Sequence, residues 1–135
     1  MGHPTACAAG LAVQRTIENE NLLDNVNTQG ALLMAALKDR FGRHRHIGDI
    51  RGRGLFLGLE IVSDRASKVP MPASERIHIT IKREAMNQGL MCYPMGGTID
   101  GQNGNHILLA PPYIIDEEHV SEIVDKLERT FQAVL

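Results

Sequence analysis

The stretch IRGRGLFLGLEIV, residues 50–62, decides the fold of this 135-residue chain. The glycines of residues 47–54 break any helix there, and Leu55–Val62 is apolar at both sets of alternating positions. A strand that is apolar on both faces is typical of the middle of a sheet rather than its edge. We therefore predict a central strand over Leu55–Val62.

A helical segment precedes this strand. Pro4 suits the first turn of a helix, and the small residues after it would let that helix approach another backbone closely. A second apolar stripe recurs at steps of four and seven and ends at Gly42. Its members are Leu22, Val26, Leu33, Leu37 and Phe41. Asparagines and acids weaken helix propensity over Asn19–Asn25, so we predict a helical arm over residues 1–42 that breaks there.

Helices and short strands alternate after the central strand. A helix is expected from Ser74 to Gln88, and a last helix, capped by Asp116, carries a clear apolar stripe. Two strands are expected between them, over Leu90–Tyr93 and Ile107–Ala110, separated by a glycine-rich hairpin or flap. The order predicts an α+β fold: a long N-terminal helical arm, then a small, mainly antiparallel sheet with helices packed on one face, over residues 43–135.

Composition excludes several classes of function. The chain is 43% hydrophobic and 22% charged, which is ordinary for a globular domain, and its net charge of -2 with scattered arginines predicts no nucleic-acid partner. No apolar run is long enough to cross a membrane and no signal peptide is visible, so we expect no membrane partner and a cytoplasmic protein. Only 4% of residues are aromatic, which suggests that a partner completes part of the core.

Cysteine and histidine spacing predicts no metal site. Cys7 and Cys92 lack metal-type spacing and are expected to be buried small hydrophobes rather than a disulfide. The histidines show no pairing at helical spacing. Arg51 and Arg53 flank Gly52, and we expect them to pair with carboxylates at a domain interface.

Four segments, in this order, resemble the pattern of the class III pyridoxal-phosphate-dependent aminotransferases. They are the Gly2-His3-Pro4 helix start, Ile50–Leu55 running into a Gly-Leu-Glu strand, Glu84–Leu90, and Ile107–Pro112 before a closing amphipathic helix. The match covers nearly the whole chain. It implies the C-terminal small domain of a fold-type-I enzyme, together with the helix that joins it to a large N-terminal domain.

The same resemblance implies a function for the parent enzyme and a limit for this chain. The parent would transfer an amino group between an amine or amino acid and a 2-oxo acid, with pyridoxal phosphate as cofactor, as a homodimer. In the family the cofactor lysine and the phosphate-binding threonine lie upstream of the Gly-His-Pro run. The four lysines here, Lys38, Lys68, Lys82 and Lys126, are all expected to be solvated. The chain alone is therefore expected to have no catalytic or cofactor-binding residue, to bind no cofactor and to be inactive.

Tyr93 is the candidate substrate-pocket residue. Many class III enzymes place a carboxylate-binding arginine after the strand that follows the Gly-Leu pair. By this resemblance, Tyr93 takes the place of that arginine here. No arginine lies between Leu90 and Val120. This departure favours an amine or an ω-amino acid as substrate. The alternative is a strand-end aromatic residue whose hydroxyl is simply solvated.

Two other interpretations stay open at this stage. The chain could be a free-standing, non-catalytic module for ligand binding or protein interaction, since fold alone does not fix function. It could also be a degenerate product that reassociates with a separately made large domain. The small-residue face at Ala6, Ala9, Gly10 and Val13 favours a partner, and we expect the isolated chain to self-associate through it.

Overall fold

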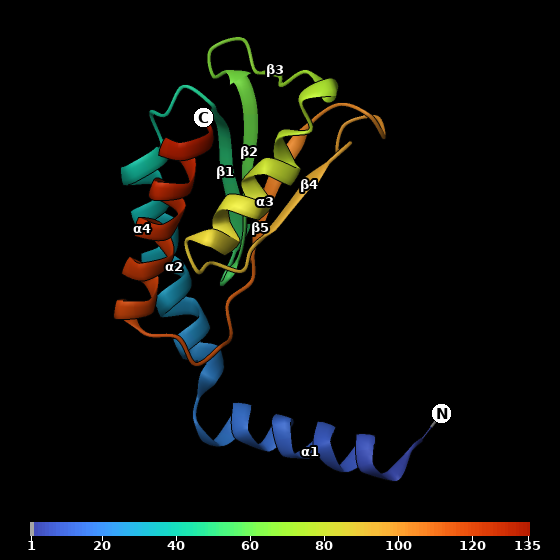
Figure 1. Ribbon diagram of the computed structural model, residues 1–135. Coiled ribbons are helices and arrows are strands. Elements are labelled where there is room, and N and C mark those ends of the chain that lie inside the picture. Colours follow the sequence, from blue (N-terminus) through green and yellow to red (C-terminus); the bar gives the residue numbers. More distant parts are fainter. Residues whose placement is uncertain (1) are drawn as a thin grey trace.

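The computed structural model describes residues 2–135 and shows an α+β arrangement (Figure 1). The predicted fold class is therefore confirmed. The elements in chain order are α1 (Pro4–Asn19), α2 (Leu22–Phe41), β1 (Ile47–Arg53), β2 (Phe56–Asp64), β3 (Val69–Pro70), the 3₁₀ helix η1 (Ala73–Glu75), α3 (Ile77–Asn87), β4 (Tyr93–Gly96), β5 (Asn105–Leu109) and α4 (Glu117–Val134).

The sheet has the strand order β1-β2-β5-β4, with every neighbouring pair antiparallel and β3 paired to the far end of β2. The central position predicted for β2 is confirmed. On one face of β2, Leu57, Leu59 and Ile61 are buried, while Phe56 on the other face is exposed. Gly58 and Glu60 follow Phe56 on that second face and are only half-buried, whereas Val62 at the far end of the strand is buried.

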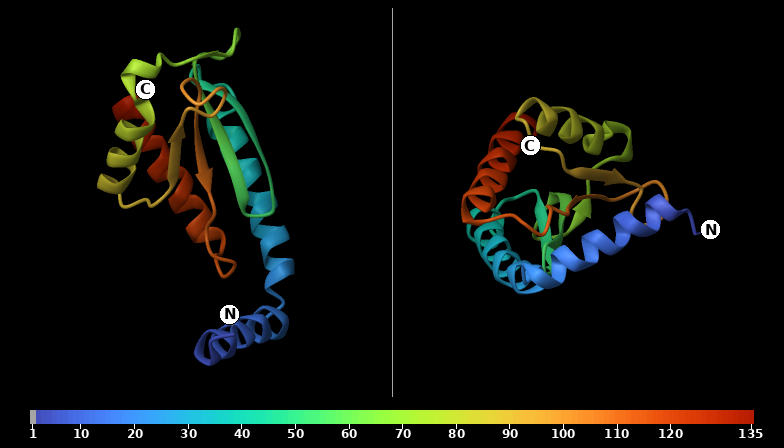
Figure 2. Two further views of the ribbon diagram at one scale, coloured as in Figure 1. Left: turned by 90° about the vertical axis from the view of Figure 1, so that its right-hand side faces the viewer. Right: turned by 90° about the horizontal axis from the view of Figure 1, so that it is seen from below.

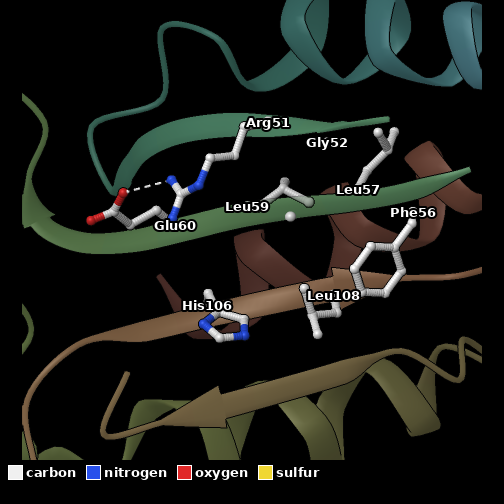
Figure 3. Close-up of a pocket in the computed structure, with 9 residues that line it drawn as sticks. Arg51, Gly52, Phe56, Leu57, Leu59, Glu60, His106 and Leu108 are labelled. Atoms are coloured by element: carbon white, nitrogen blue, oxygen red, sulfur yellow. Dashed lines mark hydrogen bonds and ion pairs between the residues drawn. The ribbon is translucent and has the colours of Figure 1, made fainter. Parts of the chain in front are cut away.

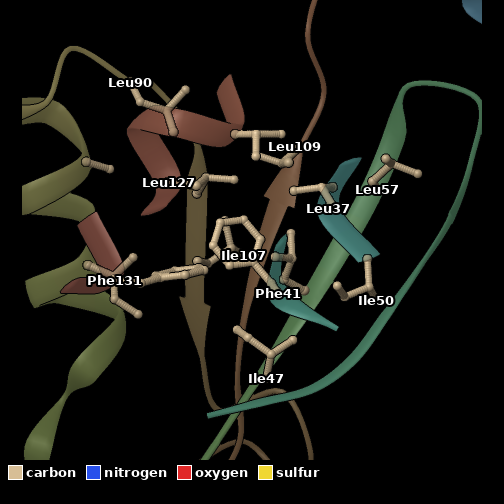
Figure 4. Close-up of a cluster of buried hydrophobic side chains, with 14 of the residues drawn as sticks. Leu37, Phe41, Ile47, Ile50, Leu57, Leu90, Ile107, Leu109, Leu127 and Phe131 are labelled. Atoms are coloured by element: carbon tan, nitrogen blue, oxygen red, sulfur yellow. The ribbon is translucent and has the colours of Figure 1, made fainter. Parts of the chain in front are cut away.

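Helices α2, α3 and α4 all pack on one face of this sheet (Figure 2). Their apolar stripes meet the buried side chains of β1, β2 and β5 in a single core (Figure 4). At the centre of this core the rings of Phe41 and Phe131 contact edge to face, with centroids 5.1 Å apart. Among residues 2–135 no helix packs on the other face of the sheet, and this asymmetry positions the candidate site.

The two helices of the arm differ in their surroundings. They are separated at Glu20 and Asn21, and Asn21 has a left-handed backbone, so the predicted break is confirmed. In α2 the side chains of Leu33, Leu37 and Phe41 belong to the core. Helix α1 has no buried residue and runs away from the lower end of α2 (Figure 1). The division of the chain at residue 42 stays a prediction, with only α1 standing apart from the core.

One strand was missed and several element boundaries differ from the prediction, including that of β5, which spans Asn105–Leu109 rather than Ile107–Ala110. Strand β1 was not anticipated, because its glycines obscure the alternation of residues 47–53. Helix α3 begins at Ile77 rather than Ser74, since Arg76 adopts a left-handed backbone that separates it from η1. Strand β4 begins at Tyr93 rather than Leu90, because Gly89 and Leu90 close the end of α3. Their amides donate to the carbonyls of Met86 and Ala85 in a Schellman arrangement.

The last helix and the glycine-rich hairpin agree with the prediction. The side chain of Asp116 accepts a hydrogen bond from the His119 amide at the start of α4. Residues 97–104 join β4 to β5 as a tight hairpin. Within residues 2–135, no helix combines the length and apolar content that a membrane crossing requires.

Candidate functional site

The helix-free face of the sheet gathers the polar and aromatic side chains of four strands. Arg51, Gly58, Leu108 and Tyr93 are successive cross-strand partners, so they lie in one row on the same face. A parallel row runs from Asp49 through Glu60 and His106 to Met95. Between β1, β2 and β5 this face is hollowed to about 210 Å³ (Figure 3). The sheet thus brings Tyr93 onto the same surface as an arginine, a carboxylate pair and a histidine.

Arg51 is the charged centre of this face. Its Nη1 donates to Asp49 Oδ2 at 2.8 Å and to Glu60 Oε2 at 3.0 Å, and Figure 3 shows its side chain reaching across to Glu60. The hydrogen bond from Arg51 lowers the pKa of Asp49, and the bonds to both carboxylates raise the pKa of Arg51. Arg51 therefore pairs with carboxylates of its own sheet, whereas the expected pairing of Arg51 and Arg53 with carboxylates at a domain interface stays a prediction. One arginine faces two acids, so the group keeps a surplus negative charge.

His106 lies half-buried beside this group, opposite Glu60 in the register of β2 and β5. Burial is the main cause that lowers the pKa of His106, and the positive charge of Arg51 lowers it further, while Glu60 acts in the opposite direction. The shift favours the neutral imidazole, which can donate one hydrogen bond and accept another. Sequence reasoning gave His106 no role, because its distance of 46 positions from Glu60 hides their pairing.

Tyr93 begins β4 at the edge of the open face, with 58% of its surface exposed. It stands opposite Leu108, and its ring is not turned into the core. Both features leave the hydroxyl free to meet a ligand or solvent. The substrate role of Tyr93 stays a prediction.

The hairpin that follows Tyr93 is held at its base and at its tip. At the base, Nδ1 of His78 on α3 lies 3.1 Å from Oδ1 of the buried Asn105, and a Cβ added at Gly96 would meet the His78 ring at 2.5 Å. At the tip, the Asp100 carboxylate accepts hydrogen bonds from the amides of Gln102 and Asn103. These bonds lower the pKa of Asp100 to about 2. Nothing in the sequence spacing pointed to the pairing of His78 with Asn105.

The four lysines do not form a cofactor site. Lys38, Lys68 and Lys82 are exposed, in agreement with the prediction. Lys126 differs, because it is partly buried and donates to the Gly89 carbonyl at 3.0 Å beside Glu122. Pyridoxal phosphate needs an enclosed lysine amine, an acid for the ring nitrogen and groups that hold the phosphate.

The hollow nearest to meeting these requirements lies at the end of α2. Lys38 and Arg65 border this open hollow of about 340 Å³. Its acid, Asp49, is already paired with Arg51, and Arg65 donates to the Gly42 carbonyl. No aromatic ring lines it. The described residues therefore do not fit the cofactor.

Metal and thiol chemistry receive no support from residues 2–135. In this part of the chain no three metal-ligating side chains come together. Both cysteines are free: Cys92 is partly buried, and burial raises the pKa of its thiol to about 11. Cys7 is exposed on α1, so the expectation that both thiols are buried is wrong for Cys7. The reason is that α1 does not pack on the core.

Comparison with known proteins decides the family. A sequence model described as aminotransferase class-III matches residues 1–131. The chain belongs to this family. An uncharacterized aminotransferase of Schizosaccharomyces pombe is 41% identical over 133 residues, which are 98% of this chain and 29% of that protein. The resemblance to the small domain of class III aminotransferases is therefore confirmed.

Solved structures of aminotransferases share this fold over the matched residues. A Bacillus anthracis aminotransferase superposes with a TM-score of 0.88 at 34% identity, over 98% of this chain and 29% of that one. An amine transaminase from an uncultivated Pseudomonas species, solved in its PLP-bound (internal aldimine) form, gives a TM-score of 0.85 at 33% identity. It is matched over 99% of this chain and 28% of its own length. The chain thus spans less than a third of the length of each of these proteins.

Proposed function

We propose that this chain forms the small domain of a pyridoxal-phosphate-dependent aminotransferase that moves an amino group between an amine or amino acid and a 2-oxo acid. The observation that carries the proposal is a family match along nearly the whole chain that covers only about 29% of the Schizosaccharomyces pombe relative. The lysine and phosphate-binding groups of the enzyme would then lie outside these 135 residues. The lack of an enclosed lysine among residues 2–135 agrees with this division.

The cofactor, when bound, supplies the electron sink that makes the substrate's Cα–H bond labile. This chain's part is recognition. Tyr93 presents a hydroxyl that supplies one neutral hydrogen bond, where an arginine would supply a charged two-pronged contact. A substrate with an α-carboxylate loses that charged contact. The proposed amino donor is therefore an amine or an ω-amino acid. One of the similar solved structures is named an amine transaminase, which agrees with this choice.

Two further features of the parent are proposed on the family resemblance. The first is a homodimeric enzyme, and the second is a cytoplasmic location. Helix α1, which has no buried residue of its own, offers surface for contacts with the rest of such an assembly.

A chimera tests the proposal. The matched residues of the Schizosaccharomyces pombe relative are replaced by this chain, and amino transfer to pyruvate is measured with amine, ω-amino-acid and α-amino-acid donors. We expect the chimera to be active, with amines and ω-amino acids preferred. The isolated chain serves as the control and should be inactive. If the isolated chain transferred amino groups and lost that activity on substitution of one of its lysines, the proposed division of the enzyme would be wrong.

A further inference from the structure

The end of α2 and the two turns beside it carry an excess of positive charge. Residues 38–46 and 64–68 hold six of the fourteen lysines and arginines of the chain but only two of its sixteen acids. The two segments meet at one end of the sheet, where β1 begins and β2 ends (Figure 1). This basic end is a local feature of a chain that is otherwise acidic.

Most of these cations have no acid partner. Among residues 2–135, Arg40 alone of the six forms ion pairs, with Asp125 and Glu128. One of the two local acids, Asp64, accepts hydrogen bonds from the amide and hydroxyl of Ser67, at 2.8 and 2.7 Å, and so closes the β2–β3 turn. Unpaired cations gathered in this way repel one another, so an anion bound among them lowers the electrostatic energy. The exposed cations without an ion pair are Lys38, Arg43, Arg45, Arg65 and Lys68.

A hollow of about 340 Å³ opens between two of these cations. Lys38 of α2 and Arg65 of the β2–β3 turn border it, together with residues 47–50 of β1. Its volume lies within the range of small-molecule sites, about 300–1,000 Å³. The one acid that lines it, Asp49, is paired with Arg51 at 2.8 Å. The charge of Lys38 and Arg65 is therefore left uncompensated.

Arg65 is held in place for a ligand. Its Nη1 donates to the Gly42 carbonyl, and its amide donates to the Arg45 carbonyl at 2.8 Å. The Gly42 amide in turn donates to the Lys38 carbonyl at 2.8 Å, so one turn residue connects both cations. A guanidinium has five N–H donors, and the bond to Gly42 leaves the others free. Because its planar group is already fixed, Arg65 loses little side-chain entropy when it binds an anion.

The helix dipole accounts for only part of this charge. Basic side chains in the last turn of a helix are favourable beside the partial negative charge of its C-terminus. Lys38 and Arg40 lie in the last turn of α2. The other four cations lie outside any helix, so the dipole gives them no reason to gather here. They are Arg43, Arg45, Arg65 and Lys68.

We propose that the hollow between Lys38 and Arg65 binds the phosphate group of a small ligand. Two cations from separate elements suit a dianion, whereas a carboxylate would be satisfied by Arg65 alone. The size of the hollow favours inorganic phosphate or a small phosphate ester over a nucleic-acid strand. The site lies at β1, the edge of the sheet opposite to β4 and Tyr93, and it does not depend on the proposed function.

An NMR titration of the 135-residue chain tests the site. Sodium phosphate and glycerol phosphate are added separately at constant ionic strength and about pH 8, where phosphate is a dianion. We expect saturable shifts of the Gly42, Gly48 and Arg65 amides, with a dissociation constant of about 1 mM or tighter. Chloride at the same ionic strength should not move them. Tighter binding of glycerol phosphate would assign a phosphate ester as ligand, and tighter binding of sodium phosphate would assign free phosphate.

Matched variants show which side chains bind the anion. Lys38→Gln and Arg65→Gln each remove one charge from the hollow, and Lys82→Gln removes the same charge from an exposed site on α3. We expect each of the first two to weaken phosphate binding about tenfold, and Lys82→Gln to leave it unchanged. Because the exposed Lys38 side chain forms no ion pair among residues 2–135, urea unfolding of Lys38→Gln should match that of the original chain.

Three results would overturn the proposal. The first is a set of shifts that grows with phosphate concentration without saturating. The second is an equal loss of affinity in Lys82→Gln and Lys38→Gln, which would reduce the binding to an effect of overall charge. The third is a short single-stranded oligonucleotide that shifts these amides when neither phosphate does, which would make a nucleic acid the partner of the basic end.

Discussion

A Cβ atom added to Gly30 would lie 2.5 Å from the carbonyl carbon and oxygen of Gly54, because α2 crosses the β1–β2 turn at backbone contact. One side chain fixes the same helix from another direction. Asn25 Nδ2 donates to the carbonyls of Tyr113 and Ile115, at 2.7 and 2.9 Å. The helix is thereby held against both the hairpin turn and the segment that leaves β5.

The contact at Gly30 predicts that alanine there lowers the free energy of unfolding, whereas helix propensity alone predicts that it raises it. Alanine at an exposed helical position stabilises by up to about 1 kcal/mol over glycine, whereas overpacking costs about 1–3 kcal/mol. Because the atoms that block the new Cβ are backbone, the clash dominates, and we expect Gly30→Ala to lower the free energy of unfolding by about 1–2 kcal/mol. Urea unfolding measures the difference.

Gly10→Ala is the matched control, since a Cβ there meets nothing within 4 Å. It should leave the free energy of unfolding unchanged or raise it slightly. If the two substitutions changed the free energy of unfolding equally, the contact between α2 and the β1–β2 turn would be looser than the structure shows.

The hairpin tip should respond to acid. Asp100 accepts hydrogen bonds from the Gln102 and Asn103 amides, and they lower its pKa from 3.8 to about 2. A carboxyl group whose pKa is lower in the folded state contributes stability that is present above the unfolded value and is lost as pH falls through the folded value. We therefore expect the hairpin to loosen as the pH falls from about 4 to 2.

Amide exchange or chemical shifts of Gln102 and Asn103 report this local opening. The Asp100→Asn variant keeps the shape of the side chain without its titration, so its hairpin should show no such step in that range. A step of equal size in the variant would assign the acid response to another group.

The lysines lead to a prediction about cofactor binding. Covalent attachment of pyridoxal phosphate needs a lysine enclosed together with contacts to the ring and the phosphate. Lys38, Lys68 and Lys82 are exposed, and Lys126 is held by Glu122 and the Gly89 carbonyl. We expect borohydride reduction of the isolated chain mixed with the cofactor to leave no lysine stoichiometrically modified, as read by peptide mass spectrometry. Full modification of one lysine, lost when that lysine is replaced by arginine, would contradict this.

The sequence was sufficient for features that depend on local chemistry. The break between α1 and α2, the central place of β2 and the Asp116 cap could all be predicted, because each depends on neighbouring residues. Strand β1 could not, since its glycines remove the alternation that marks a strand. The candidate site was accessible only in part. Tyr93 stood out by resemblance, whereas the contacts of Glu60 with Arg51 and His106 arise from the strand register, which one sequence does not reveal.

Tyr93 provides the sharpest test of substrate recognition. Its ring is exposed at the edge of the open sheet face, so Tyr93→Phe removes a hydroxyl without opening a cavity. If that hydroxyl contacts the substrate in the transition state, its loss should lower kcat/KM of the chimeric enzyme about tenfold, or about 1.4 kcal/mol. The control is Tyr113→Phe, which changes the only other tyrosine of the sequence and keeps its apolar ring. It should leave kcat/KM unchanged.

The arginine variant decides between the two interpretations of Tyr93. Tyr93→Arg restores a charged fork that can hold a carboxylate in two hydrogen bonds, and such charge-assisted bonds are roughly twice as strong as neutral ones. We expect it to shift the preference of the chimera toward α-amino acids at the expense of amines. Both donors are assayed with one 2-oxo acid, so that the ratio of their kcat/KM values reports recognition rather than stability. If neither substitution moved that ratio or the rate, Tyr93 would be a solvated strand-end residue, and the amine preference would need another origin.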